Sequence, residues 1–201
     1  PEASPTQKGK VGERVMLRVV REFFPGANIY TPEAKDGAHQ ADAIAVHWKD
    51  KRIVLVDAKA KPARTYYPDT GISERSYLTY REMGRRHRTL ILLCFVDEAI
   101  GLCYGGLLAI LARSRKIYWN GENRNYQERV SGGTGAVILF PLDFMRRLAE
   151  LDTAEIAELR EASTRRVEYT PNSKVYERLG CALAENSFLP AQSTLKTFTS
   201  N

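Results

Sequence analysis

Cysteine and long apolar runs are both scarce in this sequence. Its 201 residues include three cysteines, Cys94, Cys103 and Cys181, whose odd number and wide spacing do not suit a disulfide scaffold. We therefore expect reduced thiols and a cytoplasmic protein. The longest apolar stretch, 90–111, contains two acids and three glycines, whereas a membrane span needs roughly 20 apolar residues in succession. The sequence thus predicts a protein that needs no disulfide and has no membrane partner.

Two common catalytic patterns are missing as well. The histidines, His39, His47 and His87, show neither the HExxH spacing nor a mixed Cys/His zinc pattern. The glycine-rich run at 131–135 lacks the Lys-Ser/Thr ending of a phosphate-binding loop, and a flexible turn explains it better. These absences argue against a zinc enzyme and against a P-loop nucleotide hydrolase.

The overall composition is that of a globular protein with a basic surface. Hydrophobic residues make up 43% and charged residues 27%, and the net charge of +6 mildly favours a polyanionic partner. The Glu/Arg-rich segment 150–166 is either a solvated helix surface or a contact with a second copy or a partner protein. We expect a flexible arm at 1–10, an α/β core over 11–141, a C-terminal helical extension over 142–185 and a mobile tail at 186–201.

The spacing of apolar residues predicts a mixed α/β sheet with helices on its faces. A first helix is expected over 11–24, and the runs 41–48 and 52–59 predict an antiparallel hairpin because a polar group separates them. The remaining expected elements are helices at 73–86, 142–151, 153–162 and 172–185, and strands at 89–96, 101–108, 116–119 and 136–140.

The predicted hairpin brings acidic and basic residues together at one end. If Trp48 stands opposite Lys51, Asp42 faces Asp57, and if the turn is shifted by one residue on each strand, Asp42 faces Lys59. Either register puts these three charged residues on one face, because cross-strand partners and residues two apart point the same way. A turn of three residues would instead place Asp42 on the other face.

Converging carboxylates with a nearby ammonium group suit metal-dependent hydrolysis of a phosphodiester. Carboxylate oxygens are the ligands that Mg²⁺ prefers, and a cation beside them stabilises charge that develops on the phosphate. The strand 52–56 is apolar on both faces before Asp57 and Lys59, and burying unpaired charge is costly. The alternative is a strand that emerges into solvent with a surface ion pair between Asp57 and Lys59.

These residues resemble the PD-(D/E)XK nuclease superfamily, which includes restriction endonucleases, Holliday-junction resolvases and repair nucleases. The resemblance covers roughly residues 10–110. It consists of Glu13 on a first helix, Asp42 at the start of a strand, Asp57-Ala58-Lys59 at the end of the next strand, and a polar helix after it.

The resemblance implies a restriction-endonuclease-like core and an enzyme that cleaves DNA with Mg²⁺, for which Mn²⁺ would substitute. It also implies that Asp42 and Asp57 bind the metal, that Lys59 is the catalytic lysine and that Glu13 completes the acidic cluster. The sequence departs from the family pattern at Ala41, where proline is usual, and at Asp57, where glutamate is commoner. The alternative for Glu13 is a solvated residue in the first turns of a helix.

Basic and aromatic residues after the motif predict a nucleic-acid-binding surface, with a solvated helix face as the alternative. Two other functions stay open: a nuclease-like module that binds DNA or assembles with partners without cleaving, and a hydrolase that acts on RNA. The candidate DNA-binding residues are Lys61, Arg75, Tyr77, Arg81, Arg85, Arg86 and Arg88.

Overall fold

The fold is built around a six-stranded sheet. The computed structural model describes residues 5–32, 41–47, 52–63, 68–118, 137–163 and 178–179. The strand order is β1-β2-β3-β5-β6-β8, in which only the β3–β5 pair is parallel. The strands are β1 (Asn28–Tyr30), β2 (Ala43–His47), β3 (Arg52–Ala60), β5 (Leu90–Asp97), β6 (Leu102–Leu107) and β8 (Arg146–Glu150).

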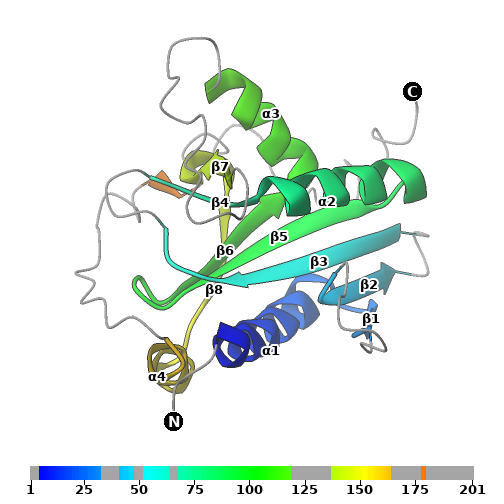
Figure 1. Ribbon diagram of the computed structural model, residues 1–201. Coiled ribbons are helices and arrows are strands. Elements are labelled where there is room, and N and C mark those ends of the chain that lie inside the picture. Colours follow the sequence, from blue (N-terminus) through cyan, green and yellow to red (C-terminus); the bar gives the residue numbers. More distant parts are fainter. Residues whose placement is uncertain are drawn as a thin grey trace.

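Helices cover both faces of this sheet, as predicted (Figure 1). On one face lies α1 (Pro5–Phe23), with α4 (Thr153–Glu161) packed beside it. On the other face lie α2 (Glu74–His87), α3 (Leu108–Tyr118) and a two-stranded sheet of β4 (Asp69–Ser73) and β7 (Val137–Pro141), which leads into a short 3-10 helix at Leu142–Phe144. The mixed α/β architecture expected from the sequence is therefore confirmed.

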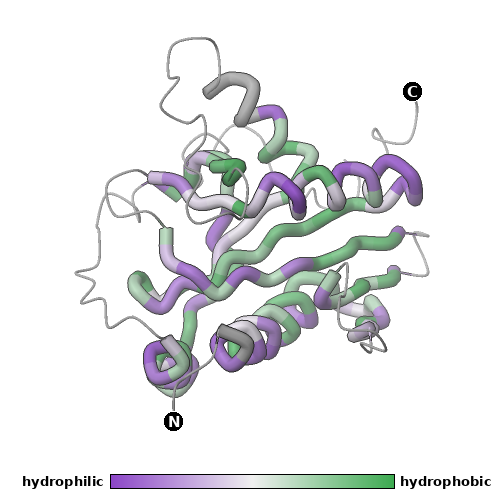
Figure 2. Tube along the Cα trace, in the orientation of Figure 1, coloured by the Kyte–Doolittle hydropathy of each residue, from purple (hydrophilic) through white to green (hydrophobic). Residues whose placement is uncertain are grey.

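The apolar residues of β3 alternate between two cores, and this alternation orients the charged residues that follow. Val54 and Val56 pack with α1, whereas Leu55 packs with α2 and its neighbours. Because side chains alternate along a strand, Asp57 continues the α2 side of the sheet. Figure 2 shows hydrophilic residues along the last half of β3, whereas β5 beside it stays hydrophobic.

The segment 142–151 corrects one prediction, because it forms no α-helix. After the 3-10 turn it becomes β8, which pairs antiparallel with β6 and carries Leu148 into the core. Over so few positions, its polar and apolar residues are compatible with both the helical and the strand period. The segment forms a strand because it pairs with the edge of β6, which would otherwise have no partner strand. The sheet thus extends beyond 141, and the helix expected at 153–162 is confirmed as α4.

Three further expectations concern the chain ends and a loop. The first helix begins at Pro5 instead of Val11, so residues 5–10 are helical where a flexible arm was expected. Residues 116–118 belong to α3 and not to a short strand. The helix expected over 172–185 and the tail at 186–201 lie outside the described residues, apart from Arg178 and Leu179.

Asp97, at the end of β5, is a buried acid with its own titration behaviour. Its carboxylate accepts hydrogen bonds from the N–H groups of Ala63 (2.8 Å) and Ala99 (2.9 Å). Burial raises the pKa of the Asp97 carboxyl to about 6, although these N–H donors lower it. The folded protein therefore binds this proton more readily than the unfolded chain does.

The free energy of unfolding should depend on pH, because the folded protein binds the Asp97 proton more tightly than the unfolded chain does. We expect wild type to gain stability relative to Asp97→Asn as the pH falls through about 6, and the gain to level off near the ordinary carboxyl pKa of about 4. Urea unfolding of both proteins between about pH 4 and pH 8 measures the difference. Parallel pH profiles for the two proteins would contradict the assignment.

Candidate active site

The register of the hairpin is one of the two that the sequence predicted. Ala43 pairs with Val56 and His47 with Arg52, which is the register that directs Asp42 toward Asp57. The regular ladder ends at Ala43, because the N–H of Asp42 donates to the carbonyl of Val56 at 2.9 Å. Asp42 is thus offset from the position directly opposite Asp57.

The carboxylate of Asp42 is nevertheless fixed beside β3. Its Oδ2 accepts a hydrogen bond of 2.6 Å from the N–H of Ala58, the residue that follows Asp57. The Asp42 charge is close enough to raise the pKa of Asp57. The start of β2 and the end of β3 therefore place two carboxyl groups in one site.

Asp57 is the buried centre of this site, with a side chain only 4% exposed. The hydroxyl of Tyr80 on α2 donates to its Oδ1 at 2.5 Å, and Lys59 Nζ lies 2.8 Å from each carboxylate oxygen. Only the Lys59 contact to Oδ1 has the geometry of a hydrogen bond, so Oδ2 has no hydrogen-bond partner among the described residues. Burial raises the pKa of the Asp57 carboxyl, and the Lys59 charge opposes that rise.

This environment separates the two explanations of the Asp57–Lys59 pair. A surface ion pair would leave both side chains in water, whereas the Asp57 side chain is buried and that of Lys59 is 33% exposed. A buried carboxylate oxygen that accepts no hydrogen bond is costly for stability. The pair is therefore not the fully solvated surface ion pair of the alternative explanation.

Lys61 follows the last residue of β3 and contacts Phe95, a core residue on the α2 side of the sheet. Its Nζ lies 5.9 Å from the centre of the Phe95 ring. Burial lowers the pKa of Lys61 to about 8, with a further decrease from the Lys59 charge and an opposing effect of Asp69. One acidic and two basic side chains, each two residues from the next, thus lie on this side of the sheet: Asp57, Lys59 and Lys61.

Glu13 does not join this cluster. It is exposed on α1, which covers the sheet face opposite to Asp57. The preceding residue, Gly12, packs so closely on β3 that an added Cβ would lie 2.8 Å from the Cβ of Ala60. Within the described parts of the chain, no group of three His, Cys, Asp or Glu residues is arranged to hold a metal ion. The expected third acid is therefore not supplied by Glu13 in this structure.

The basic residues of α2 divide into two groups. Arg81 and Arg85 are exposed and four residues apart, so they share one side of the helix axis. Arg75 and Arg86 are exposed on another side of α2, and Arg88 is the exposed C-cap residue that follows the helix. The basic residues expected to form one surface therefore do not share one side of α2.

Tyr77 is a core residue and not a surface contact as predicted. It is 3% exposed and its ring packs 6.1 Å from that of Phe140, between α2 and β7. Arg81 lies over the ring of Tyr77 at 5.6 Å. Tyr80, one helical turn later, reaches Asp57 instead. The sequence contained this tyrosine among several, but only the packing of α2 on β3 shows which one contacts the acid.

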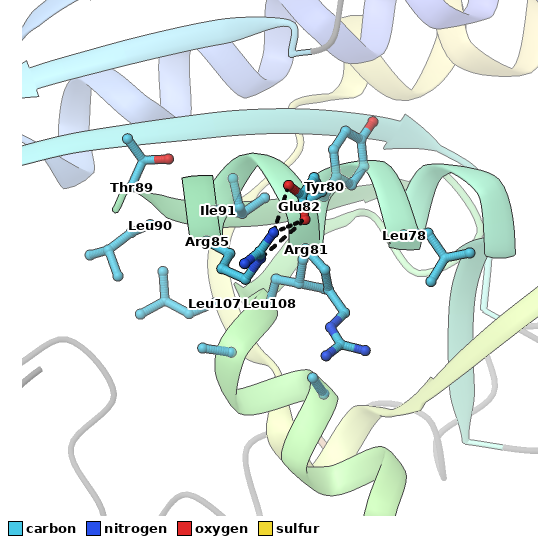
Figure 3. Close-up of a pocket in the computed structure, with 13 residues that line it drawn as sticks. Leu78, Tyr80, Arg81, Glu82, Arg85, Thr89, Leu90, Ile91, Leu107 and Leu108 are labelled. Carbon is cyan, nitrogen blue, oxygen red and sulfur yellow. Dashed lines mark hydrogen bonds and ion pairs between the residues drawn. The ribbon is translucent and has the colours of Figure 1, made fainter. Parts of the chain in front are cut away.

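A separate cavity of about 500 Å³ lies between α2 and α3. Its walls include Leu78, Arg81 and Arg85 from α2 and Leu108 from α3. Figure 3 shows the Tyr80 hydroxyl directed away from these residues and toward a strand of the sheet, where it meets Asp57. The cavity and the acidic site are therefore on different sides of the Tyr80 ring.

The donor atoms of the acidic site fit a small divalent cation. Asp42 and Asp57 supply hard oxygen ligands, and Oδ2 of Asp57 accepts no hydrogen bond from the described residues, although Lys59 Nζ lies 2.8 Å from it. Mg²⁺ is commonly held by one or two carboxylates and retains several waters, so two acids are a sufficient protein contribution. The partly exposed ammonium of Lys59 supplies a positive charge beside these carboxylates, which suits an anionic substrate.

Comparisons with known proteins identify no family for this chain. No family model matches it, and no curated protein gives a significant match. Among solved structures, the Holliday junction resolvase Hjc of Archaeoglobus fulgidus shares 12% identity with a TM-score of 0.38, over 51% of this chain and 79% of that one. Membership of the PD-(D/E)XK superfamily thus stays a prediction. None of the described helices is long and apolar enough to span a membrane.

Proposed function

We propose that this protein is a Mg²⁺-dependent phosphodiesterase that cleaves DNA, in the manner of an endonuclease. The observation that carries the proposal is the buried Asp57 carboxylate. Lys59 contacts both of its oxygens, one of which accepts no hydrogen bond from the described residues, and Asp42 is fixed beside it. A site that binds both a cation and an anion is what hydrolysis of a charged ester requires.

The residues have distinct roles in this mechanism. Asp42 and Asp57 would hold the ion, which when bound supplies Lewis-acid stabilisation and lowers the pKa of water. Lys59 reaches from the buried carboxylate to the surface, so its ammonium group can contact a phosphate oxygen and stabilise the negative charge that develops there. Lys61, the residue after the end of β3, would bind a neighbouring phosphate of the same DNA strand.

The direct test is cleavage of supercoiled plasmid with Mg²⁺, with Mn²⁺ and with a chelator. We expect nicked and linear products with either metal and none with the chelator. Parallel reactions with duplex DNA, branched DNA, single strands and RNA identify the substrate class. Intact DNA in all reactions, with DNA binding retained, would contradict the phosphodiesterase proposal. It would favour a nuclease-like module that binds DNA without cleaving it.

The pair of arginines on one side of α2 gives a separate prediction about DNA binding. Arg81 and Arg85 are exposed beside the cavity, and phosphate contacts by such residues release counterions. We expect Arg81→Gln and Arg85→Gln each to weaken duplex binding and to lower the salt dependence, log Kd against log salt, by about one unit of slope. Fluorescence anisotropy without divalent metal measures both quantities.

Arg21→Gln is the matched control for these variants. Arg21 is equally exposed but belongs to α1, on the opposite face of the sheet. It should change neither affinity nor slope. Equal losses of DNA affinity in all three variants would indicate a general effect of net charge and would contradict a DNA-binding role for α2.

A further inference from the structure

Tyr80 donates a hydrogen bond to Asp57, but it has no role in the mechanism proposed above. Its side chain is 7% exposed, and its hydroxyl donates to Oδ1, the same oxygen that accepts the hydrogen bond of Lys59. Oδ2 has no such bond within the described residues. The two oxygens of one carboxylate therefore differ: Oδ1 accepts two hydrogen bonds, whereas Oδ2 has the ion-pair contact with Lys59 Nζ at 2.8 Å.

The Tyr80 hydroxyl can act only as a donor in this position. Burial raises the pKa of the phenol, and the adjacent Asp57 charge raises it further. The phenol donates to Oδ1, and this hydrogen bond favours the ionised carboxylate. An ionised carboxylate is also the form that binds a metal ion.

The ring of Tyr80 is held in place by its surroundings. It packs in the core on the α2 side of the sheet, and on its other side it forms part of the wall of the 500 Å³ cavity. A carboxylate on a short side chain can rotate about its last bond. A donor on a fixed ring favours the plane in which one oxygen accepts its hydrogen bond, because intermediate rotations break that bond.

We propose that Tyr80 is a positioning residue that fixes the Asp57 carboxylate so that Oδ2 is presented to a divalent cation. Tyr80 would not contact the ion or the substrate. It acts through Asp57, as outer hydrogen-bond partners of metal ligands do. This proposal rests on the proposed metal site and names the residue that orients it.

The test compares Tyr80→Phe with wild type in Mn²⁺ binding, measured by calorimetry and by electron paramagnetic resonance of the free ion. Removing one oxygen atom and keeping the ring should leave the fold intact and weaken Mn²⁺ binding about tenfold. Tyr80→4-aminophenylalanine, which retains a donor at the far end of the ring, should recover part of the affinity. Tyr104→Phe is the matched control, because it removes a buried phenol that donates to a different carboxylate, Asp97, at 3.3 Å.

The outcomes separate this proposal from the proposed function. Tyr80→Phe that is folded by circular dichroism and binds Mn²⁺ as wild type does overturns the positioning role, as does an equal loss in Tyr104→Phe. If Tyr80→Phe does not fold, Tyr80→4-aminophenylalanine replaces it in the test, and this weaker donor must bind Mn²⁺ less tightly than wild type. Wild type that binds Mn²⁺ but cleaves no nucleic acid refutes the phosphodiesterase and leaves the role of Tyr80 standing. Wild type that binds no Mn²⁺ refutes both.

Discussion

Asp57→Asn should abolish metal-dependent cleavage while leaving the protein folded. The amide keeps the shape of the carboxylate and an oxygen for the Tyr80 hydroxyl, but it removes the charge that attracts the cation. Loss of several kcal/mol of metal-derived stabilisation in the transition state corresponds to a rate decrease of roughly a thousandfold, since each 1.4 kcal/mol is tenfold. Initial rates of plasmid nicking with saturating Mg²⁺ measure the loss.

The effect on stability should have the opposite sign. Burial raises the pKa of Asp57, which means that the folded state disfavours its charged form. At neutral pH, Asp57→Asn removes a buried charge, and we expect its melting temperature to equal or exceed that of wild type. A residue kept only for the fold would show destabilisation instead.

Asp97→Asn is the control for this experiment. It makes the same chemical change at a second buried acid, at the end of the adjacent strand β5, which bonds to the N–H groups of Ala63 and Ala99. Cleavage by this variant should match wild type where it is folded. A comparable loss of activity in both variants would point to a general disturbance of the sheet and would remove Asp57 from the centre of the site.

The hairpin was predictable because two independent patterns agree on it. Strand 52–56 is apolar on both faces, which marks a buried central strand, and the polar group between the strands restricts the turn to few lengths. The period of two along β3 then puts Asp57 and Lys59 on a common face without knowledge of the rest of the fold. Only the offset of Asp42 needed coordinates, because a local irregularity leaves no mark in the alternation of residues.

The contacts that the sequence could not supply are those between distant elements. Tyr80 lies 23 residues from Asp57, and helical spacing allows several residues of α2 to face the sheet. Glu13 suits either face on a helical wheel, and the close packing of Gly12 on Ala60 decides its direction. Likewise, β8 is a strand because it pairs with the edge of β6, a long-range contact that local residue propensities do not encode.

Lys59→Gln should separate catalysis from metal binding. The glutamine removes the ammonium group that lies 2.8 Å from Asp57 and that we expect to stabilise charge on the phosphate. Loss of one such stabilising group lowers turnover by roughly 100-fold to 1,000-fold. Mn²⁺ binding at alkaline pH should persist or become tighter, because a cation that competes for the Asp57 oxygens has been removed. Single-turnover cleavage and calorimetry with Mn²⁺ give the two quantities.

The same substitution should change the pH dependence of metal binding. The Lys59 charge lowers the pKa of Asp57, so its removal raises that pKa and decreases the ionised fraction at any given pH. The acidic limb of the Mn²⁺ binding profile should therefore move to higher pH in Lys59→Gln. In Lys10→Gln, which changes an exposed lysine of α1 on the opposite face, it should stay in place. A lysine that merely formed a surface ion pair would move neither the turnover nor this limb, so the combination of both changes is specific to a Lys59 that acts beside a buried metal ligand.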